Sequence, residues 1–207
     1  MSTEINYLVN GPSDAAITLI MAHGAGAAMD SDWMNDVSNQ IAEAGIQTVR
    51  FEFPYMVESR STGKKRPPNA QKILLGTWKK VASDWKEEKM LFLSGKSMGG
   101  RMASLIIDDV SAAGMICFGF PFHAFGKPPK NRIDHLKNLS SKLLIIQGER
   151  DTMGTQEEVS EYDLSKAIEI HWLKDGDHSF KPRKKSGFTH EEHISSACRA
   201  AVEFMQK

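Results

Sequence analysis

The chain has 207 residues, of which 41% are hydrophobic and 25% are charged, and its 26 basic side chains equal its 26 acidic ones. This length fits a single domain spanning residues 1–207, and a balanced charge gives no overall attraction to nucleic acid or to a membrane surface. No apolar stretch approaches the roughly 20 residues of a membrane span, and the N-terminus lacks the basic and apolar segments of a signal peptide. We therefore expect a cytoplasmic protein without nucleic-acid or membrane partners, in which Cys117 and Cys198 are buried thiols rather than a disulfide.

The predicted elements alternate between strands and helices. Short apolar runs bounded by turn residues predict strands at 7–10, 17–22, 48–53, 90–93, 115–119, 143–146 and 168–173, the first being a short edge strand. Apolar residues at helical spacing predict helices around Trp33, Val37 and Ile41, around Leu74, Trp78, Val81 and Trp85, and around Ile194, Cys198 and Val202. This alternation predicts an α/β fold, with a mainly parallel sheet of six or seven strands and helices on both faces.

Two helix ends carry local signals. Gly45 fits the C-terminal stop of the first helix, and Thr189 with Glu192 fits a capping box at the start of the last one. The tryptophans of the helical segments lie on apolar faces, so we assign them to the core.

Ser97 lies in the segment Gly95-Lys96-Ser97-Met98-Gly99, between an apolar strand and a helical pattern. A strand, a tight turn and a helix around a Gly-x-Ser-x-Gly motif form a nucleophile elbow. The turn forces the serine into a strained backbone conformation, and Gly95 and Gly99 remove side chains that would collide where strand and helix pack closely. The motif predicts that Ser97 is an accessible nucleophile.

A serine hydroxyl needs a base to take its proton and an acid to orient that base. Asp151 follows the strand 143–146, and His178 follows the strand 168–173. Because the carboxyl ends of parallel strands share one sheet edge, these residues should meet Ser97 there. The order Ser97, Asp151, His178 resembles that of an alpha/beta-hydrolase triad.

Other acids are less suited to the triad. The segment 114–132 holds no Asp or Glu that could replace Asp151, and Glu149 is expected to be a solvated carboxylate at a strand end. Asp175 and Asp177 are expected to shape the turn before His178, since Asp favours turns by bonding to nearby backbone.

The other histidines receive different expectations. We expect His135, His190 and His193 to be solvated and His171 to be structural within its strand. His123 follows a strand at the predicted catalytic edge, so it is an additional polar candidate for the site.

An oxyanion hole needs two backbone N–H donors aimed where negative charge develops. Met98, immediately after the nucleophile, is expected to supply one. The loop after strand 17–22 reads His23-Gly24-Ala25-Gly26-Ala27, and its small residues let the backbone approach a substrate. Ala25 or Gly26 is the candidate for the second donor, and His23 is expected to anchor the loop.

The gap between strands 115–119 and 143–146 is about twenty residues, which is the size of a loop rather than a cap domain. We therefore expect no large lid and an open site that suits extended or bulky acyl groups better than a long lipid chain. His123, Phe122 and Met56 are the candidate substrate contacts, and Met29, Phe120 and Phe125 could also line an acyl pocket.

Basic residues gather in the loops of the predicted catalytic edge. They are Arg60, Lys64, Lys65 and Arg66, then Lys127, Lys130 and Arg132, and finally Lys181, Arg183, Lys184 and Lys185. Glu58 is the one acidic residue in these stretches. The hypothesis is an electropositive mouth that steers a carboxylated or phosphorylated ester; the alternative is that these are ordinary solvated loops.

Several further segments carry a family resemblance. They are His23-Gly24-Ala25-Gly26, Phe51-Glu52-Phe53-Pro54-Tyr55-Met56, Lys65-Arg66-Pro67-Pro68, Gly95-Lys96-Ser97-Met98-Gly99-Gly100, Gly119-Phe120-Pro121-Phe122-His123, Gln147-Gly148-Glu149-Arg150-Asp151 and Gly176-Asp177-His178-Ser179-Phe180. The chain resembles a family of small alpha/beta hydrolases that includes bacterial proteins, an animal testis-expressed protein and a subunit of a nonspecific-lethal chromatin complex. The scaffold also resembles dienelactone hydrolases, which use a cysteine nucleophile where this chain has Ser97.

Two classes of function follow. The first is a serine hydrolase that acts on a small-molecule ester or thioester, with Ser97 as nucleophile, His178 as base and Asp151 as its orienting acid. The second is a binding or scaffold protein that keeps the fold without turnover, as the resemblance to the chromatin-complex subunit permits. The presence of all three triad residues favours the hydrolase. We expect no cofactor and no metal, because the histidines and cysteines lack ligand spacing.

Overall fold

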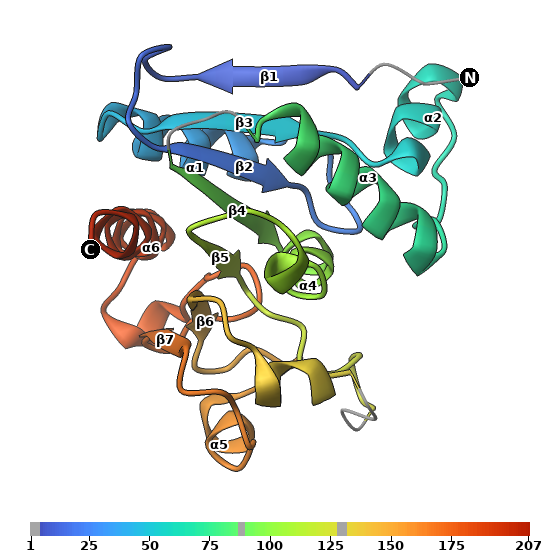
Figure 1. Ribbon diagram of the computed structural model, residues 1–207. Coiled ribbons are helices and arrows are strands. Elements are labelled where there is room, and N and C mark those ends of the chain that lie inside the picture. The colour runs from blue at the N-terminus through green and yellow to red at the C-terminus, as the bar shows by residue number, and fades with distance from the viewer. Residues whose placement is uncertain (1–4, 87–89, 128–131) are drawn as a thin grey trace.

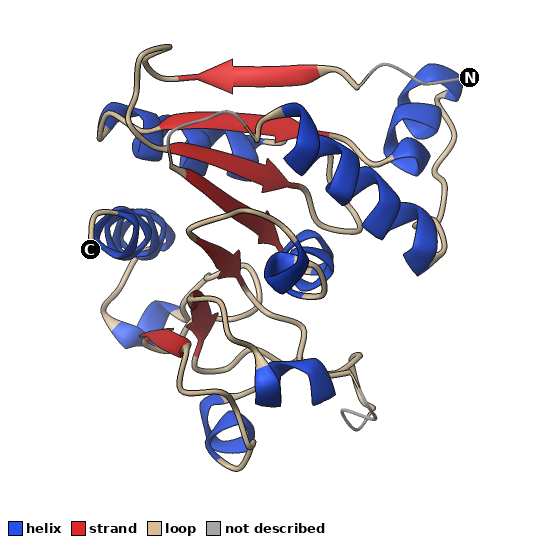
Figure 2. Ribbon diagram, in the orientation of Figure 1, coloured by secondary structure: helices blue, strands red, loops and turns tan. Residues whose placement is uncertain are grey.

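The structure is a computed structural model that describes residues 5–86, 90–127 and 132–207. A seven-stranded sheet runs through the molecule, with helices on both of its faces (Figure 1, Figure 2). Its strands are β1 (Tyr7–Asn10), β2 (Thr18–Ala22), β3 (Gln47–Phe51), β4 (Leu91–Lys96), β5 (Gly114–Phe118), β6 (Leu143–Gly148) and β7 (Ile168–Leu173). Their spatial order is β1-β3-β2-β4-β5-β6-β7, and neighbours are parallel except for β1 and β3. The predicted α/β fold is confirmed.

The helices lie in the connections between these strands and in the segment that follows β7 (Figure 1). They are α1 (Asp32–Glu43), α2 (Pro54–Thr62), α3 (Gln71–Asp84), α4 (Met98–Ser104), α5 (Gln156–Ser160) and α6 (His190–Met205), with short 3-10 helices η1 (Ile107–Asp109), η2 (Asp134–Asn138) and η3 (Lys184–Ser186). In the described part of the β5–β6 connection the structure contains η2, so no large cap domain covers the sheet edge. None of the helices in the described ranges is long and apolar enough to span a membrane.

Alternation of side chains along the strands divides the core into two halves. In β4, Leu91 and Leu93 join the half covered by α3 and α4, while Phe92 between them joins the half covered by α1 and α6. Trp78 of α3 is fully buried in the first half, as its helical spacing predicted. Strands β2, β5 and β6 are buried along their whole length, which is why they read as continuous apolar runs.

Local signals located some helix ends and missed two helices. Gly45, with φ +83°, follows the end of α1, and Thr189 forms the predicted capping box at the start of α6. Helix α2 begins at Pro54, but it buries Tyr55 alone and so shows no apolar period. Helix α5 is 5 residues long and is marked by a capping box at Thr155.

The topology places a switch point between the neighbouring strands β2 and β4. The connection after β2 leads to α1 on one face of the sheet, while the connection after β4 leads to α4 on the other. In open α/β sheets, ligands commonly bind at the carboxyl ends of strands where successive connections diverge in this way. The loop that begins at His23 and the turn at Ser97 both start from this point.

Candidate active site

The turn between β4 and α4 holds Ser97 in a strained conformation, with φ 50° and ψ −114°. Its backbone N–H donates to the carbonyl of Phe118 at 3.0 Å. A Cβ atom on Gly95 would strike the backbone of Gly100, and one on Gly99 would lie 2.5 Å from the carbonyl oxygen of His23. The strand and helix therefore pack as closely as the motif predicted.

His178 connects the serine to the buried acid. Its Nε2 lies 2.9 Å from Ser97 Oγ, and its Nδ1 lies 2.7 Å from Asp151 Oδ2. Because a carboxylate accepts hydrogen bonds and does not donate them, the proton of the neutral imidazole belongs on Nδ1. Nε2 is then free to accept the hydroxyl proton of Ser97. The structure thus brings together the three predicted triad residues from the ends of β4, β6 and β7.

Asp151 is fully buried and its carboxylate is fixed by further donors. Oδ1 accepts from the Met153 N–H at 2.8 Å, and Oδ2 accepts from Gln147 Nε2 at 2.8 Å. The Gln147 amide is itself held by the backbone of Phe120, with Oε1 accepting at 2.7 Å and Nε2 donating at 3.2 Å. Sequence reasoning missed Gln147, although a buried amide at the end of an apolar strand is a visible signal.

The loop after β2 is anchored by His23 and Tyr55. His23 is fully buried; its Nε2 accepts from the Phe53 N–H at 3.1 Å, so Nδ1 donates to the Gly24 carbonyl at 2.7 Å. Burial lowers the pKa of His23, which keeps this ring neutral. The Tyr55 hydroxyl lies 3.2 Å from the carbonyl oxygen of Gly24 and 3.0 Å from that of Ala25. The sequence analysis identified His23 as an anchor but missed Tyr55, although Tyr55 lies in one of the family-like segments.

These contacts orient the peptide groups of the loop. In a trans peptide the N–H points opposite to the C=O, so turning the carbonyls of Gly24 and Ala25 toward Tyr55 turns the N–H groups of Ala25 and Gly26 the other way. A Cβ on Gly24 would lie 3.9 Å from Ser97 Cβ, which puts this loop beside Ser97. Met98 opens α4, where an N–H has no intrahelical acceptor. The three predicted oxyanion donors therefore lie in the two segments that flank Ser97.

The loop that carries His178 is closed by its own polar groups. Asp177 Oδ1 accepts from the N–H groups of Ser179 and Lys181 at 2.8 and 2.9 Å. Asp175, with φ 57°, forms ion pairs with Arg183 and Arg150. The hydrogen bond from Arg183 holds the pKa of Asp175 well below its usual range. Both aspartates shape this turn, as predicted.

The expectation of a solvated side chain is wrong for His193 and holds only in part for His135 and Glu149. His193 is 3% exposed and its Nδ1 bonds the Phe180 carbonyl at 2.8 Å. His135 is half-buried and bonds Ser104 Oγ at 2.8 Å, and burial lowers its pKa to about 4. Glu149 is partly buried and accepts from the Asp175 N–H at 2.8 Å. Each of the three side chains has a polar partner that is distant in sequence.

His171 and His190 also form hydrogen bonds within the fold. His171 in β7 lies 3.2 Å from Ser196 Oγ of α6, in keeping with a structural role. His190 Nε2 lies 2.9 Å from the carbonyl oxygen of Ser179, so this half-buried side chain contacts the His178 loop rather than solvent alone.

The predicted substrate contacts lie in different environments. Phe122 is fully buried against Phe120 and Tyr162, so it packs in the core and presents no surface to a substrate. His123 is 6% exposed, and its Nδ1 bonds the Ala124 carbonyl at 3.0 Å. Met56 is partly buried against the core. The assignment of Phe122 to substrate binding needs correction, because the chain turns its ring inward after β5.

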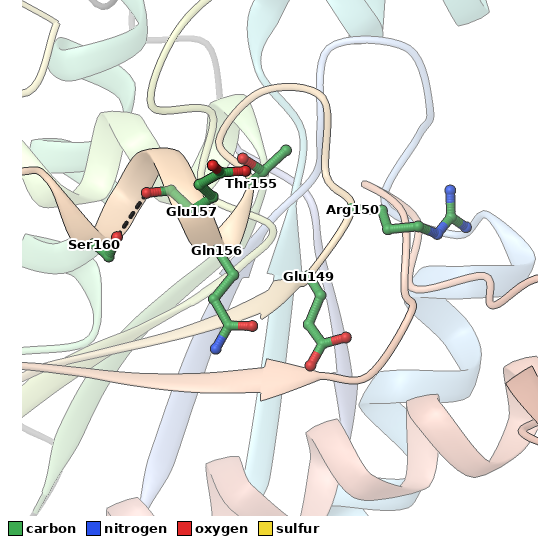
Figure 3. Close-up of a pocket in the computed structure, with 6 residues that line it drawn as sticks. All are labelled: Glu149, Arg150, Thr155, Gln156, Glu157 and Ser160. Carbon is green, nitrogen blue, oxygen red and sulfur yellow. Dashed lines mark hydrogen bonds between the residues drawn. The ribbon is translucent and has the colours of Figure 1, made fainter.

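Two surface hollows lie near this edge of the sheet. One of about 550 Å³ is lined by Glu149, Arg150, Thr155, Gln156, Glu157 and Ser160, with the Arg150 side chain pointing away from α5 (Figure 3). Another of about 500 Å³ is lined by His123, Phe125, Gly126, Lys127, Thr152, Thr155 and Glu158. Neither hollow is lined by the triad residues, and both Ser97 and His178 are partly exposed, the His178 side chain by 26%. Within the described ranges, no cluster of three or more His, Cys, Asp or Glu side chains could hold a metal ion.

A family model described as an alpha/beta hydrolase domain matches residues 15–206. A search of curated protein sequences finds no significant match.

Solved structures of similar fold cover nearly the whole chain. An alpha-beta serine hydrolase homologue from Coxiella burnetii is 17% identical, with a TM-score of 0.71 and coverage of 99% of this chain and 98% of that one. A serine hydrolase without lid from Xanthomonas campestris is 17% identical, with a TM-score of 0.71 and coverage of 99% and 96%. Dienelactone hydrolase from Anabaena variabilis is 16% identical, with a TM-score of 0.75 and coverage of 99% and 92%. At these identities the likeness is one of fold.

Proposed function

Because the chain belongs to the alpha/beta hydrolase domain family, we propose that it is a serine hydrolase that cleaves a carboxylic ester or thioester. The observation that carries this proposal is the hydrogen-bonded row from Ser97 through His178 to Asp151, with distances of 2.9 and 2.7 Å. A hydroxyl, an imidazole and a buried carboxylate in this order are the parts of an activated nucleophile.

In the acylation step, Ser97 Oγ attacks the carbonyl carbon of the substrate and its proton passes to His178 Nε2. Asp151 Oδ2 stabilises the imidazolium that forms and keeps the ring in place. The tetrahedral intermediate collapses, the bond to the alkoxide or thiolate breaks, and His178 returns the proton to that leaving group. The product alcohol or thiol departs and the acyl group remains on Ser97.

In the second step, water attacks the acyl carbon while His178 Nε2 takes a proton from it. The ester bond to Ser97 Oγ then breaks, and His178 gives the proton back to the serine. The carboxylic acid leaves and the starting state of the three residues returns. The partial exposure of the His178 side chain, at 26%, supports water as the acyl acceptor.

Negative charge develops on the carbonyl oxygen in both steps. We assign its stabilisation to the N–H of Met98 together with that of Ala25 or Gly26. Loss of one such donor typically lowers turnover by about 100- to 1,000-fold. The contacts from Tyr55 to the carbonyls of Gly24 and Ala25 support this assignment, because they leave the N–H groups facing away from the tyrosine.

We also propose that anionic esters are preferred. Arg60, Arg66 and Arg183 form ion pairs with acidic neighbours, which weakens their part in an electropositive mouth. The support for the proposal therefore narrows to Arg132, which is partly buried, and to exposed lysines, namely Lys64, Lys65, Lys127, Lys181, Lys184 and Lys185. Lys130, which the same hypothesis included, lies outside the described residues.

We also propose that the protein is located in the cytoplasm. Cys117 and Cys198 are both free and buried, and burial raises the pKa of the Cys198 thiol to about 12. Unpaired thiols suit a reducing environment, which supports a cytoplasmic location.

The test is labelling with a fluorophosphonate probe, which reacts with activated serines. We expect wild-type protein to be labelled, and Ser97→Ala and His178→Ala to lose labelling while remaining folded by circular dichroism. Ser94→Ala, which removes a buried hydroxyl from the same strand, should label as the wild type does. A folded wild-type protein that is neither labelled nor active on p-nitrophenyl acetate would instead favour the scaffold function.

A further inference from the structure

Lys96, the residue that directly precedes Ser97, has no role in the proposed chemistry and lies in an unusual place. Along β4 its side chain points to the same face as Phe92, toward α1 and α6. Its Nζ lies 5.5 Å from the centre of the Trp33 ring and 5.0 Å from that of Phe180. A long apolar side chain would pack well against such walls. A charge placed there costs desolvation free energy, which the two rings offset only in part by cation–π attraction, so the hydrogen-bond partner of the ammonium group matters.

The ammonium group of Lys96 donates a hydrogen bond to the backbone carbonyl of His178. This bond ties the residue that carries the base to the strand end that carries the nucleophile. Gly119, with φ +72°, leaves the space for this bond: a Cβ there would lie 2.6 Å from Lys96 Nζ and 3.1 Å from the His178 carbonyl oxygen. The bond from Lys96 to His178 therefore depends on the absence of a side chain at Gly119, directly after β5.

The His178 loop depends on side-chain donors at successive carbonyls. The carbonyl of Ser179 lies 2.9 Å from His190 Nε2, and that of Phe180 lies 2.8 Å from His193 Nδ1, both on α6. The carbonyl before these two, that of His178 itself, accepts from the ammonium group of Lys96. His190 and His193 bind the end of the loop to α6, while Lys96 binds His178 to the end of β4.

We propose that Lys96 is a positioning residue, whose ammonium group fixes the main chain of His178 and so keeps the imidazole between Ser97 and Asp151. This inference rests on the proposed serine hydrolase function. It assigns to Lys96 an effect on turnover rather than on substrate binding, because the lysine acts through His178 and touches no substrate.

The charged groups around Lys96 and its burial make its hydrogen bond to His178 depend on pH. Burial lowers the pKa of Lys96 to about 8, against the favourable charges of Asp151 in the loop after β6 and Asp177 in the loop after β7. Cys117 of β5 also faces it, with a thiol whose pKa is raised by burial; α1 contributes the uncharged Trp33. The ammonium is present below pH 8 and is lost as the pH rises above it, which leaves a neutral amine and a weaker hydrogen bond.

The experiment compares Lys96→Met, which keeps the length but removes the charge and the donor, with Lys96→Arg, which keeps both. For p-nitrophenyl acetate we expect Lys96→Met to lower kcat by about 10- to 100-fold with KM within about twofold of wild type, as for a displaced catalytic group. Lys96→Arg should recover much of kcat. Wild-type kcat should fall as the pH rises through about 8, and this decline should be absent in Lys96→Arg. Lys72→Met, on the exposed face of α3, is the control and should match wild type.

A second measurement does not require turnover. The Nδ1–H of His178, bonded to Asp151 Oδ2 at 2.7 Å, should give a downfield proton resonance in wild-type protein. We expect this resonance to broaden or vanish in Lys96→Met, with a urea midpoint close to that of wild type. A retained resonance and unchanged kcat in Lys96→Met would overturn the inference. If wild-type protein neither reacts with fluorophosphonate nor hydrolyses the ester, the proposed function fails, and the resonance alone decides the role of Lys96.

Discussion

At the scale of single residues, the site depends on side chains that never meet a substrate. Gln147 holds the Asp151 carboxylate, and Tyr55 holds the carbonyls of Gly24 and Ala25. Burial raises the pKa of Tyr55 to about 12, so its hydroxyl remains a donor throughout the working pH range. The rigidity of the site thus comes from polar groups that are buried and bonded.

Tyr55→Phe tests this support because it removes one oxygen and keeps the ring. We expect kcat for p-nitrophenyl acetate to fall by about 10-fold, a fraction of the loss of a whole oxyanion donor, because the loop peptides are less firmly held. KM should change little. Tyr7→Phe is the matched control, since the Tyr7 hydroxyl bonds Asp84 far from the site. Equal kcat values in Tyr55→Phe and Tyr7→Phe would show that the Tyr55 hydroxyl does not support the loop that carries Ala25 and Gly26.

At the scale of elements, the contact between β4 and α4 sets the backbone geometry of Ser97. The helix approaches the strand so closely that a Cβ on Gly100 would strike the sulfur of Cys117 and lie 2.7 Å from the Gly95 carbonyl oxygen. Trp78 Nε1 of α3 donates to the Gly99 carbonyl at 3.1 Å, which fixes the helix from its other side. The elbow is therefore held by its neighbours as well as by its own turn.

Replacing Gly100 by alanine measures this packing. We expect Gly100→Ala to lower the free energy of unfolding by about 1–3 kcal/mol, because an added methyl group overfills the contact. Gly76→Ala is the same substitution in α3, where a Cβ meets nothing within 4 Å. It should raise the free energy of unfolding by about 0.5–1 kcal/mol by restricting the unfolded chain. Urea unfolding measures the free energy of unfolding of both variants. A Gly100→Ala protein as stable as wild type would contradict the close contact.

At the scale of the whole molecule, zero net charge conceals an uneven distribution. Exposed lysines lie in the connections that follow β3, β5 and β7, while Arg60, Arg66 and Arg183 in the same connections form ion pairs. Any steering of a substrate depends on these lysines and acts over distances that salt screens, since the Debye length is about 10 Å at 0.1 M salt.

Steering predicts a salt dependence that differs between two substrates. For a p-nitrophenyl ester with a terminal carboxylate, kcat/KM should fall as NaCl rises from about 10 to 500 mM, while the methyl-capped neutral ester should change little. Lys184→Glu with Lys185→Glu should flatten the slope for the anionic ester. Identical salt responses of the two esters would refute the anionic preference.

The sequence by itself determined the fold class, the strand order along the chain and the meeting of Ser97, Asp151 and His178. Apolar runs mark buried strands, and each of these three residues lies in the turn or loop after one of them, so a parallel sheet brings them to one edge. The glycines of the elbow were readable for the same reason, because a tight strand-to-helix turn excludes side chains. The catalytic roles of the three residues remain predictions until the serine is labelled.

Only the tertiary structure decided which polar side chains are buried and what they hold. His193 and Lys96 resemble surface residues in a linear pattern, yet both bond the His178 loop from elements distant in sequence. Phe122 resembles a pocket residue, yet its ring turns into the core. A hydrogen bond between distant segments leaves no periodic trace, because it depends on where two chain segments cross and not on the spacing within either one.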